Sequence, residues 1–385
     1  MKLLREMNVK NKTVILRCDF NVPIKDGYIL NNDKILASLK TINYLLSQNS
    51  KIIIMSHLGK IKIKEDLKKN TLFPVYNNLK KLYPNIKIFF CEHTKGKHLE
   101  NLAKNLKEKE ILLIENTRFE DLPAKKESSC DLELSKYWST LGEVFIDDAF
   151  GLTHRRHASN YGIKKYLPSA IGLLIEEELN NLEPLMKPAK PFIVIMGGAK
   201  AYDKILLIRN LLERCDYLLL GGGIANTFLR VNYEIGKSLN SPEYINEVKE
   251  LLLKYPNKII MPIDVKVLNN EEVFTKNINA IYKEDIIYDL GPKTISLYEK
   301  YINKSKTIFI NGTIGLYEDK RFAEGTKSIL KICSLSNSKC ILGGGDAVAS
   351  SSYFNIKNFD YLSTGGGATL KYISTGQLKS MEDIC

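Results

Sequence analysis

A series of apolar runs that end in glycine is the feature that most constrains the fold of this chain. The runs lie between residues 191 and 367 and read PFIVIMGGAK, DYLLLGGG, TIFINGTIG, CILGGGD and YLSTGGG. A short, continuously apolar run bounded by turn residues is typical of a buried parallel strand. Glycine lets the backbone approach a ligand, and the N-terminus of a following helix favours phosphate. Four of the runs end in a cluster of two or three glycines, at 197–198, 221–223, 343–345 and 365–367. A tight packing turn could explain one such cluster, but four clusters predict a nucleotide site at the carboxyl edge of a sheet.

The N-terminal half of the chain also alternates between strand-like and helical patterns. Strands are predicted at 13–18, 51–56, 87–91, 111–115 and 143–147, with helices at 34–48 and 74–83, and the C-terminal half adds helices at 203–214, 242–254 and 322–332. This alternation predicts an α/β protein with two Rossmann-like domains, each a parallel sheet flanked by helices. Residues 176–191 read as an acidic helix that ends in three prolines, and they predict a helical hinge between domains at 1–175 and 192–370.

Composition excludes several classes of protein. With 44% hydrophobic and 26% charged residues, no membrane-length apolar stretch and no signal-peptide layout at the N-terminus, we expect a soluble cytoplasmic protein without a membrane role. Seven scattered cysteines without a CxxC pair argue against a disulfide framework or a structural zinc site. The net charge of +12 comes mainly from lysine and accompanies no nucleic-acid-binding motif, so we expect small anions as partners, and no nucleic acid.

Charged and polar side chains follow the strands of the N-terminal half, where glycine follows those of the C-terminal half. They are Arg17, Asp19, Asn21, Ser56, His57, Glu115, Asn116, Arg118, Asp147, Asp148, His154 and Arg155. The carboxyl ends of parallel strands share one edge, so we expect these groups to converge. Guanidinium groups bind phosphate and carboxylate bidentately, which predicts a site for a small acid. Together the two halves predict phosphoryl transfer between a nucleotide and an acid, with hinge closure to exclude water.

The common nucleotide-binding motifs are absent. Gly236-Lys237-Ser238 ends like a P-loop, but Val231 stands where that motif needs glycine. No GxGxxG opens a helix, and the HRD and DFG motifs of protein kinases are missing. The predicted nucleotide site is therefore of another kind.

Eleven segments, in order, resemble the phosphoglycerate kinase family from end to end. They are RCDFNVP (17–23), MSHLGK (55–60), IENTRFED (114–121), IDDAFGLTHRRHAS (146–159), GGAKAYDK (197–204), GGGIANTFL (221–229), LGPKT (290–294), NGTIGLYE (311–318), FAEGTK (322–327), GGGDA (343–347) and STGGGATL (363–370). The resemblance implies a monomeric, hinge-bending, magnesium-dependent kinase of glycolysis. Such an enzyme transfers phosphate reversibly between ATP and the carboxylate of 3-phosphoglycerate, giving ADP and 1,3-bisphosphoglycerate. That carboxylate is ionised at pH 7, so positioning and positive charge are needed and a general base is not.

The resemblance also implies roles for individual residues. Lys34, Lys200 and Lys204 would be catalytic. The phosphoglycerate would be bound by Arg17, Asp19, Phe20, Asn21, Lys34, His57, Leu58, Gly59, Lys60, Arg118 and Arg155. The nucleotide would be bound by Gly198, Lys200, Lys204, Gly221, Gly222, Gly223, Gly291, Asn311, Glu318, Gly344, Gly345, Asp346 and Ala347. Asp346 would contact the magnesium ion of Mg-ATP or Mg-ADP, and residues 371–385 would complete the N-terminal domain.

Lys34 is the main departure from the family pattern. An arginine that reaches the transferring phosphoryl group normally stands there, and lysine keeps its charge but loses the planar fork. Smaller departures are Lys60, Asp147, Arg156, Thr313, Ala347 and Lys371. These departures leave open an alternative, namely a catalytically weakened or substrate-shifted relative that binds nucleotide and acts through interaction or regulation.

Overall fold

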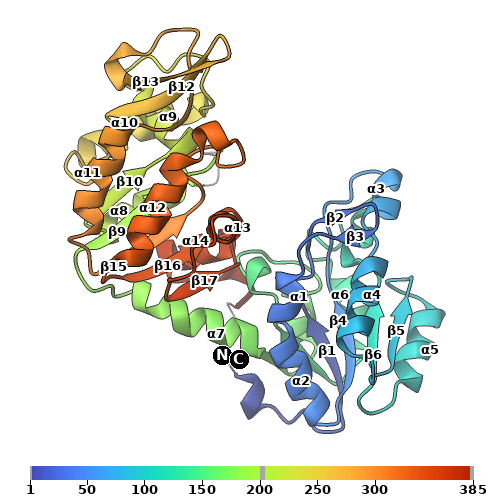
Figure 1. Cartoon of the computed structure of the whole chain (residues 1–385). Coiled ribbons are helices and arrows are strands. Elements are labelled where there is room, and N and C mark those ends of the chain that lie inside the picture. Colours follow the sequence, from blue (N-terminus) through green and yellow to red (C-terminus); the bar gives the residue numbers. More distant parts are fainter. Residues whose placement is uncertain (1, 200–203, 382–385) are drawn as a thin grey trace. The chain divides into compact units, whose positions relative to one another are not determined.

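The computed structural model describes residues 2–199 and 204–381, and the chain divides into two compact units (Figure 1). Unit 1 consists of Met1–Asn180 and Gln377–Cys385, and unit 2 consists of Asn181–Gly376. The chain therefore passes from one unit to the other twice. Among the described residues, no helix combines the length and apolar character needed to cross a bilayer.

Unit 1 is built on a six-stranded parallel sheet with the order β5-β6-β4-β1-β7-β8. Its strands are β1 (Thr13–Arg17), β4 (Lys51–Met55), β5 (Ile88–Cys91), β6 (Ile111–Ile114), β7 (Val144–Asp147) and β8 (Ser169–Ile171). Its helices are α1 (Asp33–Ala37), α2 (Leu39–Ser47), α3 (Lys64–Lys69), α4 (Phe73–Leu82), α5 (Lys97–Asn105) and α6 (Leu132–Ser139). All five predicted strands are present to within one residue at each end.

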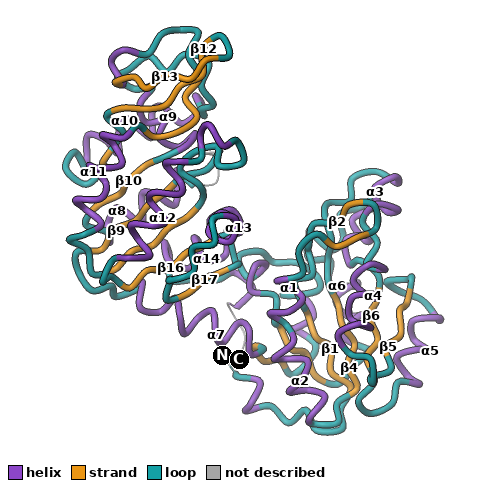
Figure 2. Tube along the Cα trace, viewed as in Figure 1, coloured by secondary structure: helices purple, strands orange, loops and turns teal. Residues whose placement is uncertain are grey.

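Both faces of this sheet are buried, which explains why its strands are continuously apolar. Leu16 and Ile54 pack into one hydrophobic cluster, whereas their neighbours Ile15 and Ile53 pack into another that contains Trp138. Successive strand residues point to opposite faces, so helices on both faces demand apolar residues at every position. Figure 2 shows the strands of each unit lying among its helices.

Unit 2 repeats the architecture with a parallel sheet of order β11-β10-β9-β15-β16-β17. Its strands are β9 (Phe192–Met196), β10 (Tyr217–Leu220), β11 (Ile259–Ile260), β15 (Thr307–Asn311), β16 (Lys339–Gly343) and β17 (Tyr361–Ser363). Its helices include α8 (Ile205–Arg214), α9 (Gly222–Leu229), α10 (Ile245–Lys254), α11 (Pro292–Ile302), α12 (Glu324–Leu335), α13 (Gly345–Tyr353) and α14 (Gly367–Thr375). Each of the five glycine-ended runs is a strand of this sheet.

Two small antiparallel elements were not predicted. A three-stranded sheet in unit 2 contains β12 (Asp264–Asn269), β13 (Glu272–Asn277) and β14 (Ile286–Leu290), in the order β13-β12-β14. A hairpin in unit 1 pairs β2 (Ile24–Lys25) with β3 (Tyr28–Ile29). The residues of β13 are almost all exposed, so its sequence carries no buried apolar run.

Two adjacent carboxylates at the end of β7 hold segments that lead to the second unit. Asp148 accepts the backbone N–H of Leu174 at 2.9 Å, at the start of helix α7 (Leu173–Leu182). Burial raises the pKa of Asp148 to about 8. Asp147 pairs with the Nζ of Lys164 at 2.6 Å, and the same ammonium donates to the carbonyl of Ser380 at 2.9 Å. The end of β7 thus fixes both the start of α7 and the C-terminal segment.

Candidate active site

The loops that follow β1 and β4 are bonded together at the carboxyl edge of the unit 1 sheet. The N–H of Phe20 donates to the hydroxyl of Ser56 at 2.8 Å, and the N–H of Gly59 donates to the side-chain carbonyl of Asn21 at 2.9 Å. The side chains of Phe20 and Leu58 are buried in the hydrophobic core. Only the backbone of these two residues is therefore available to a ligand.

Asp19 lies between two of the predicted site residues. Its Oδ2 accepts a hydrogen bond from Lys34 Nζ at 2.8 Å, and its Oδ1 is 4.0 Å from His57 Nδ1. Burial opposes ionisation of Asp19, but the charge and hydrogen bond of Lys34, with the N–H of Asn21, outweigh it and hold its pKa below the ordinary value. Burial lowers the pKa of His57 well below its ordinary value despite Asp19, so the imidazole is neutral at pH 7.

The three predicted arginines have different surroundings. Arg17 is fully buried, donates through Nε to the hydroxyl of Ser159 at 2.7 Å, and lies beneath the rim formed by the strand ends. Arg118 is 9% exposed, and its Nη1 is 3.7 Å from Asp121. Arg155 is exposed and donates through Nε to His154 at 2.9 Å. Lys60 is exposed at the same edge.

Three buried nitrogens of this group lack a hydrogen-bond partner among the described residues. They are Nη2 of Arg17, Nδ1 of His57 and Nε of Arg118. Buried polar atoms in folded proteins are nearly always bonded to protein, water or ligand. Two of the three belong to guanidinium groups, which can only donate. The unit 1 rim is therefore suited to an acceptor-rich anion.

In unit 2 the ends of β9, β15 and β16 form a second polar edge. Lys204 precedes α8, and its Nζ donates to the carbonyl of Gly197 at 2.8 Å. The Asn311 amide donates to the carbonyl of Gly343 at 2.7 Å. Gly312 has a φ of +79°, and a Cβ there would lie 2.9 Å from Lys204 Nζ. Lys200, predicted to share this role, lies outside the described residues.

Helix N-termini surround the same edge. Gly221, Gly291 and Gly344 are the N-cap residues of α9, α11 and α13. The first N–H groups of a helix have no partner within it, and the helix dipole favours anions there. The other predicted nucleotide ligands lie on this unit as well. Gly345, Asp346 and Glu318 are exposed and Ala347 is buried. Gly198 follows β9, and Gly222 and Gly223 begin α9.

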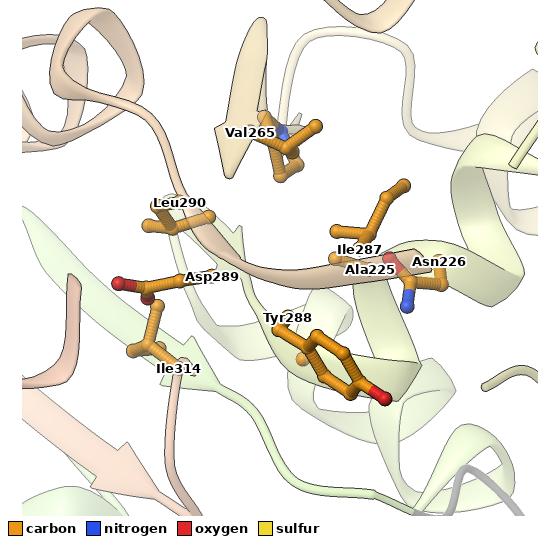
Figure 3. Close-up of a pocket in the computed structure, with 10 residues that line it drawn as sticks. Ala225, Asn226, Val265, Ile287, Tyr288, Asp289, Leu290 and Ile314 are labelled. Carbon is orange, nitrogen blue, oxygen red and sulfur yellow. The ribbon is translucent and has the colours of Figure 1, made fainter. Parts of the chain in front are cut away.

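A mostly apolar pocket opens beside these glycines (Figure 3). It is lined by Gly222, Ala225, Asn226, Pro262, Val265, Ile287, Tyr288, Asp289, Leu290 and Ile314. Most of these residues were missed from the sequence, because Val265, Ile287 and Tyr288 belong to the unpredicted antiparallel sheet. The available signal was the LGPKT motif, which begins at Leu290 on the pocket wall.

Asp346 is the predicted metal ligand. Among the described residues no group of three or more histidine, cysteine, aspartate or glutamate side chains could hold a metal ion. A single exposed carboxylate beside Lys204 nevertheless suits Mg²⁺, which in such sites takes one or two carboxylates and keeps phosphate oxygens and water as its other ligands. The donor set therefore fits a metal that arrives with a nucleotide.

Comparisons with known proteins agree on one family. The sequence profile described as phosphoglycerate kinase matches residues 4–376. A phosphoglycerate kinase of Staphylococcus aureus (strain bovine RF122 / ET3-1) is 42% identical over 391 aligned residues, covering 100% of this chain and 98% of the relative. The solved phosphoglycerate kinase of Coxiella burnetii has a TM-score of 0.83 at 33% identity, covering 98% of this chain and 97% of that one. That of Pyrococcus horikoshii OT3 has a TM-score of 0.88 at 29% identity, covering 100% and 98%.

Proposed function

The chain belongs to the phosphoglycerate kinase family, and from that premise we propose how its two units divide the reaction. The activity is reversible phosphoryl transfer between ATP and the carboxylate of 3-phosphoglycerate. No observation favours the alternative of a non-catalytic relative. We assign the acid to unit 1, because its rim holds buried guanidinium nitrogens that lack a hydrogen-bond partner among the described residues. We assign the nucleotide to unit 2, where Lys204 and three helix N-termini meet at one sheet edge.

Each proposed ligand follows from the chemistry at its position. The phosphate and carboxylate of the acid are bound by Arg118, Arg155 and Lys60. Its hydroxyl and backbone are bound by Asp19 and Asn21. The buried side chains of Arg17 and His57 complete the rim beneath them. In unit 2, Lys204 follows the transferring group, Asn311 lies near the phosphates, and Glu318 binds the ribose. We place the base against the mouth of the apolar pocket beside Gly222, since flat rings are held by apolar walls with few polar groups.

We extend the proposal to the setting of the reaction. Mg²⁺ held by Asp346 would neutralise charge on the phosphates as transfer proceeds. Unit 1 is the acid-binding domain, unit 2 is the nucleotide-binding domain, and residues 176–191 act as a hinge whose bending brings donor and acceptor together. We propose a monomer that acts on small molecules and binds neither nucleic acid nor membrane, as the family activity suggests. The scattered cysteines support a reducing compartment such as the cytoplasm.

The test is a coupled assay of the purified protein with 3-phosphoglycerate, ATP and magnesium. Turnover should require all three, and a chelator such as EDTA should abolish it. Measurable ADP binding without turnover would contradict the assignment of this acid as the substrate.

The charge state of Lys204 predicts a pH dependence. Burial lowers the pKa of Lys204 to about 8, against the opposing charge of Asp346. The ammonium is charged below that pH and neutral above it, so kcat/KM for ATP should fall by up to about tenfold per pH unit above pH 8, because this constant reports the free enzyme. Initial rates from pH 6 to 10 check this, with Lys204→Arg as a control that stays charged. A flat profile to pH 10 would contradict the expectation.

Replacing Lys34 with arginine should raise kcat about tenfold. The ammonium of Lys34 donates a hydrogen bond to Asp19. The planar guanidinium of an arginine has additional N–H donors, which could bind the phosphoryl group as well. One charge-assisted bond contributes about 1.5–3 kcal/mol, and about 1.4 kcal/mol is tenfold in rate. The coupled assay measures the change, with Lys40→Arg, at an exposed lysine of unit 1 outside the assigned site, as the matched control. A fall in kcat would instead indicate a site tuned to another acid.

A further inference from the structure

Glu127 is a fully buried carboxylate that the sequence analysis did not single out. It lies between the short helix Thr117–Asp121 and helix α6. Its Oε1 accepts the Ser159 hydroxyl at 2.5 Å and the Thr117 hydroxyl at 3.2 Å, and its Oε2 accepts the Ser159 N–H at 3.0 Å. Its Oε1 also lies 3.8 Å from Nη2 of Arg17. One side chain therefore contacts three separate segments.

These three segments are the ones that carry the arginines of the unit 1 rim. Thr117 directly precedes Arg118 in the sequence, and Ser159 lies four residues after Arg155. Arg17 ends β1 and shares Ser159 with the carboxylate, because its Nε donates to the same hydroxyl. The backbone supports this arrangement, since the carbonyl of Glu127 accepts the N–H of Ala158 at 2.9 Å.

Charge and burial make this carboxylate hard to replace. Arg17 and Glu127 are both fully excluded from solvent, and removing one member of such a pair leaves the other charge uncompensated. Burial raises the pKa of Glu127, whereas Arg17 and the two bonds from Ser159 act against this shift. Because its contacts hold the Glu127 carboxylate in place, that carboxylate also fixes the positions of Arg17, Thr117 and Ser159.

We propose that Glu127 is a positioning residue for the acid-binding rim: it fixes Arg17 and the segments carrying Arg118 and Arg155, and so presets the rim for phosphoglycerate. Glu127 touches no substrate itself. The proposal rests on the assignment of the acid to unit 1 made above. Loss of Glu127 should affect only the acid, because all of these contacts lie in unit 1. The effect can be large, because misplacing a binding group by about an ångström can cost up to a hundredfold in rate.

Glu127→Gln tests the proposal, because glutamine keeps the shape and removes the charge. We expect the KM for 3-phosphoglycerate to rise about tenfold while the KM for ATP changes less than about twofold. Ser159→Ala, which removes one shared hydroxyl, should raise the same KM about threefold and guards against a variant that fails to fold. The fluorescence of Trp138, the one tryptophan of the chain, shows whether unit 1 is folded.

Glu110→Gln is the matched control. Glu110 is also a buried glutamate of unit 1, but it precedes β6 at the opposite edge of the sheet and accepts the N–H of Lys107. It should leave both KM values unchanged. Equal rises for both substrates in Glu127→Gln, or an unchanged KM for the acid in folded protein, overturn the positioning role alone. If the wild-type protein binds ADP but shows no turnover with 3-phosphoglycerate, the assignment of the acid is wrong, and this proposal falls with it.

Discussion

Replacing Lys204 with alanine should lower kcat about a thousandfold. The ammonium sits among Gly197, Gly198 and Gly312, where the absence of side chains leaves room for phosphate oxygens beside it. Charge that develops on a transferring phosphoryl group is stabilised by preorganised donors, and loss of one such donor costs about a hundred- to a thousandfold. A cation in a half-buried site belongs at the upper end of that range. The coupled assay at saturating substrates measures the change.

Lys258 provides a matched control for that experiment. It is also a half-buried lysine of unit 2, and its Nζ donates to the carbonyls of Leu212 and Cys215, each at 2.9 Å. It precedes β11 and so lies at the amino edge of the sheet. Lys258→Ala should leave kcat within about twofold. A Lys204→Ala protein that retains a tenth or more of the wild-type kcat would falsify the catalytic role.

Replacing Lys164 with methionine should lower the free energy of unfolding of unit 1 by about 3–5 kcal/mol. The side chains of Lys164 and Asp147 are only 4% and 1% exposed, so the substitution leaves a buried carboxylate without its counter-charge. It also removes the bond from Lys164 to the carbonyl of Ser380. Urea unfolding followed by the fluorescence of Trp138 reports on this unit, because that side chain lies in its core.

An exposed ion pair of the same unit gives the comparison. Lys40 contacts Glu177 at 2.5 Å, but the two side chains are 64% and 38% exposed. Solvent screens such a pair, so Lys40→Met should cost less than about 1 kcal/mol. Similar losses for the two substitutions would contradict the argument from burial. The pair with Lys164 also gives a structural partner to Asp147, where the family pattern has asparagine.

The parallel sheets were predictable because burial on both faces leaves a mark that is local in the sequence. The run at β9 is apolar at every position, and all five of its residues are buried. Strand β13 of the antiparallel sheet leaves no such mark. Five of its six residues are exposed, including Val273 and Phe274, so burial imposes no apolar run and only its pairing with β12 makes it a strand.

The residues of the candidate site could be predicted from the sequence, but how deeply each is buried could not. Charged residues after strands identified the rim of unit 1, because strand ends can be located from apolar runs. The sequence did not show that Arg17 is buried, since that depends on Glu127 and Ser159, which lie far from it along the chain. The apolar pocket of unit 2 was missed for a similar reason, because its walls on β12 and β14 come together only through strand pairing, which places Val265 opposite Leu290.

Unit 1 is built from two segments that unit 2 separates in the sequence, and this affects the order in which the protein can fold during synthesis. A ribosome synthesises Asn181–Gly376, the whole of unit 2, before it synthesises Gln377–Cys385, which belongs to unit 1. Ser380 in that segment bonds through its N–H to the carbonyl of Thr153 at 2.8 Å and through its own carbonyl to Lys164. N-terminal domains generally fold first during synthesis. Here a segment of the first unit is synthesised after the whole of the second, so the first unit cannot have all its contacts until the second unit has been synthesised.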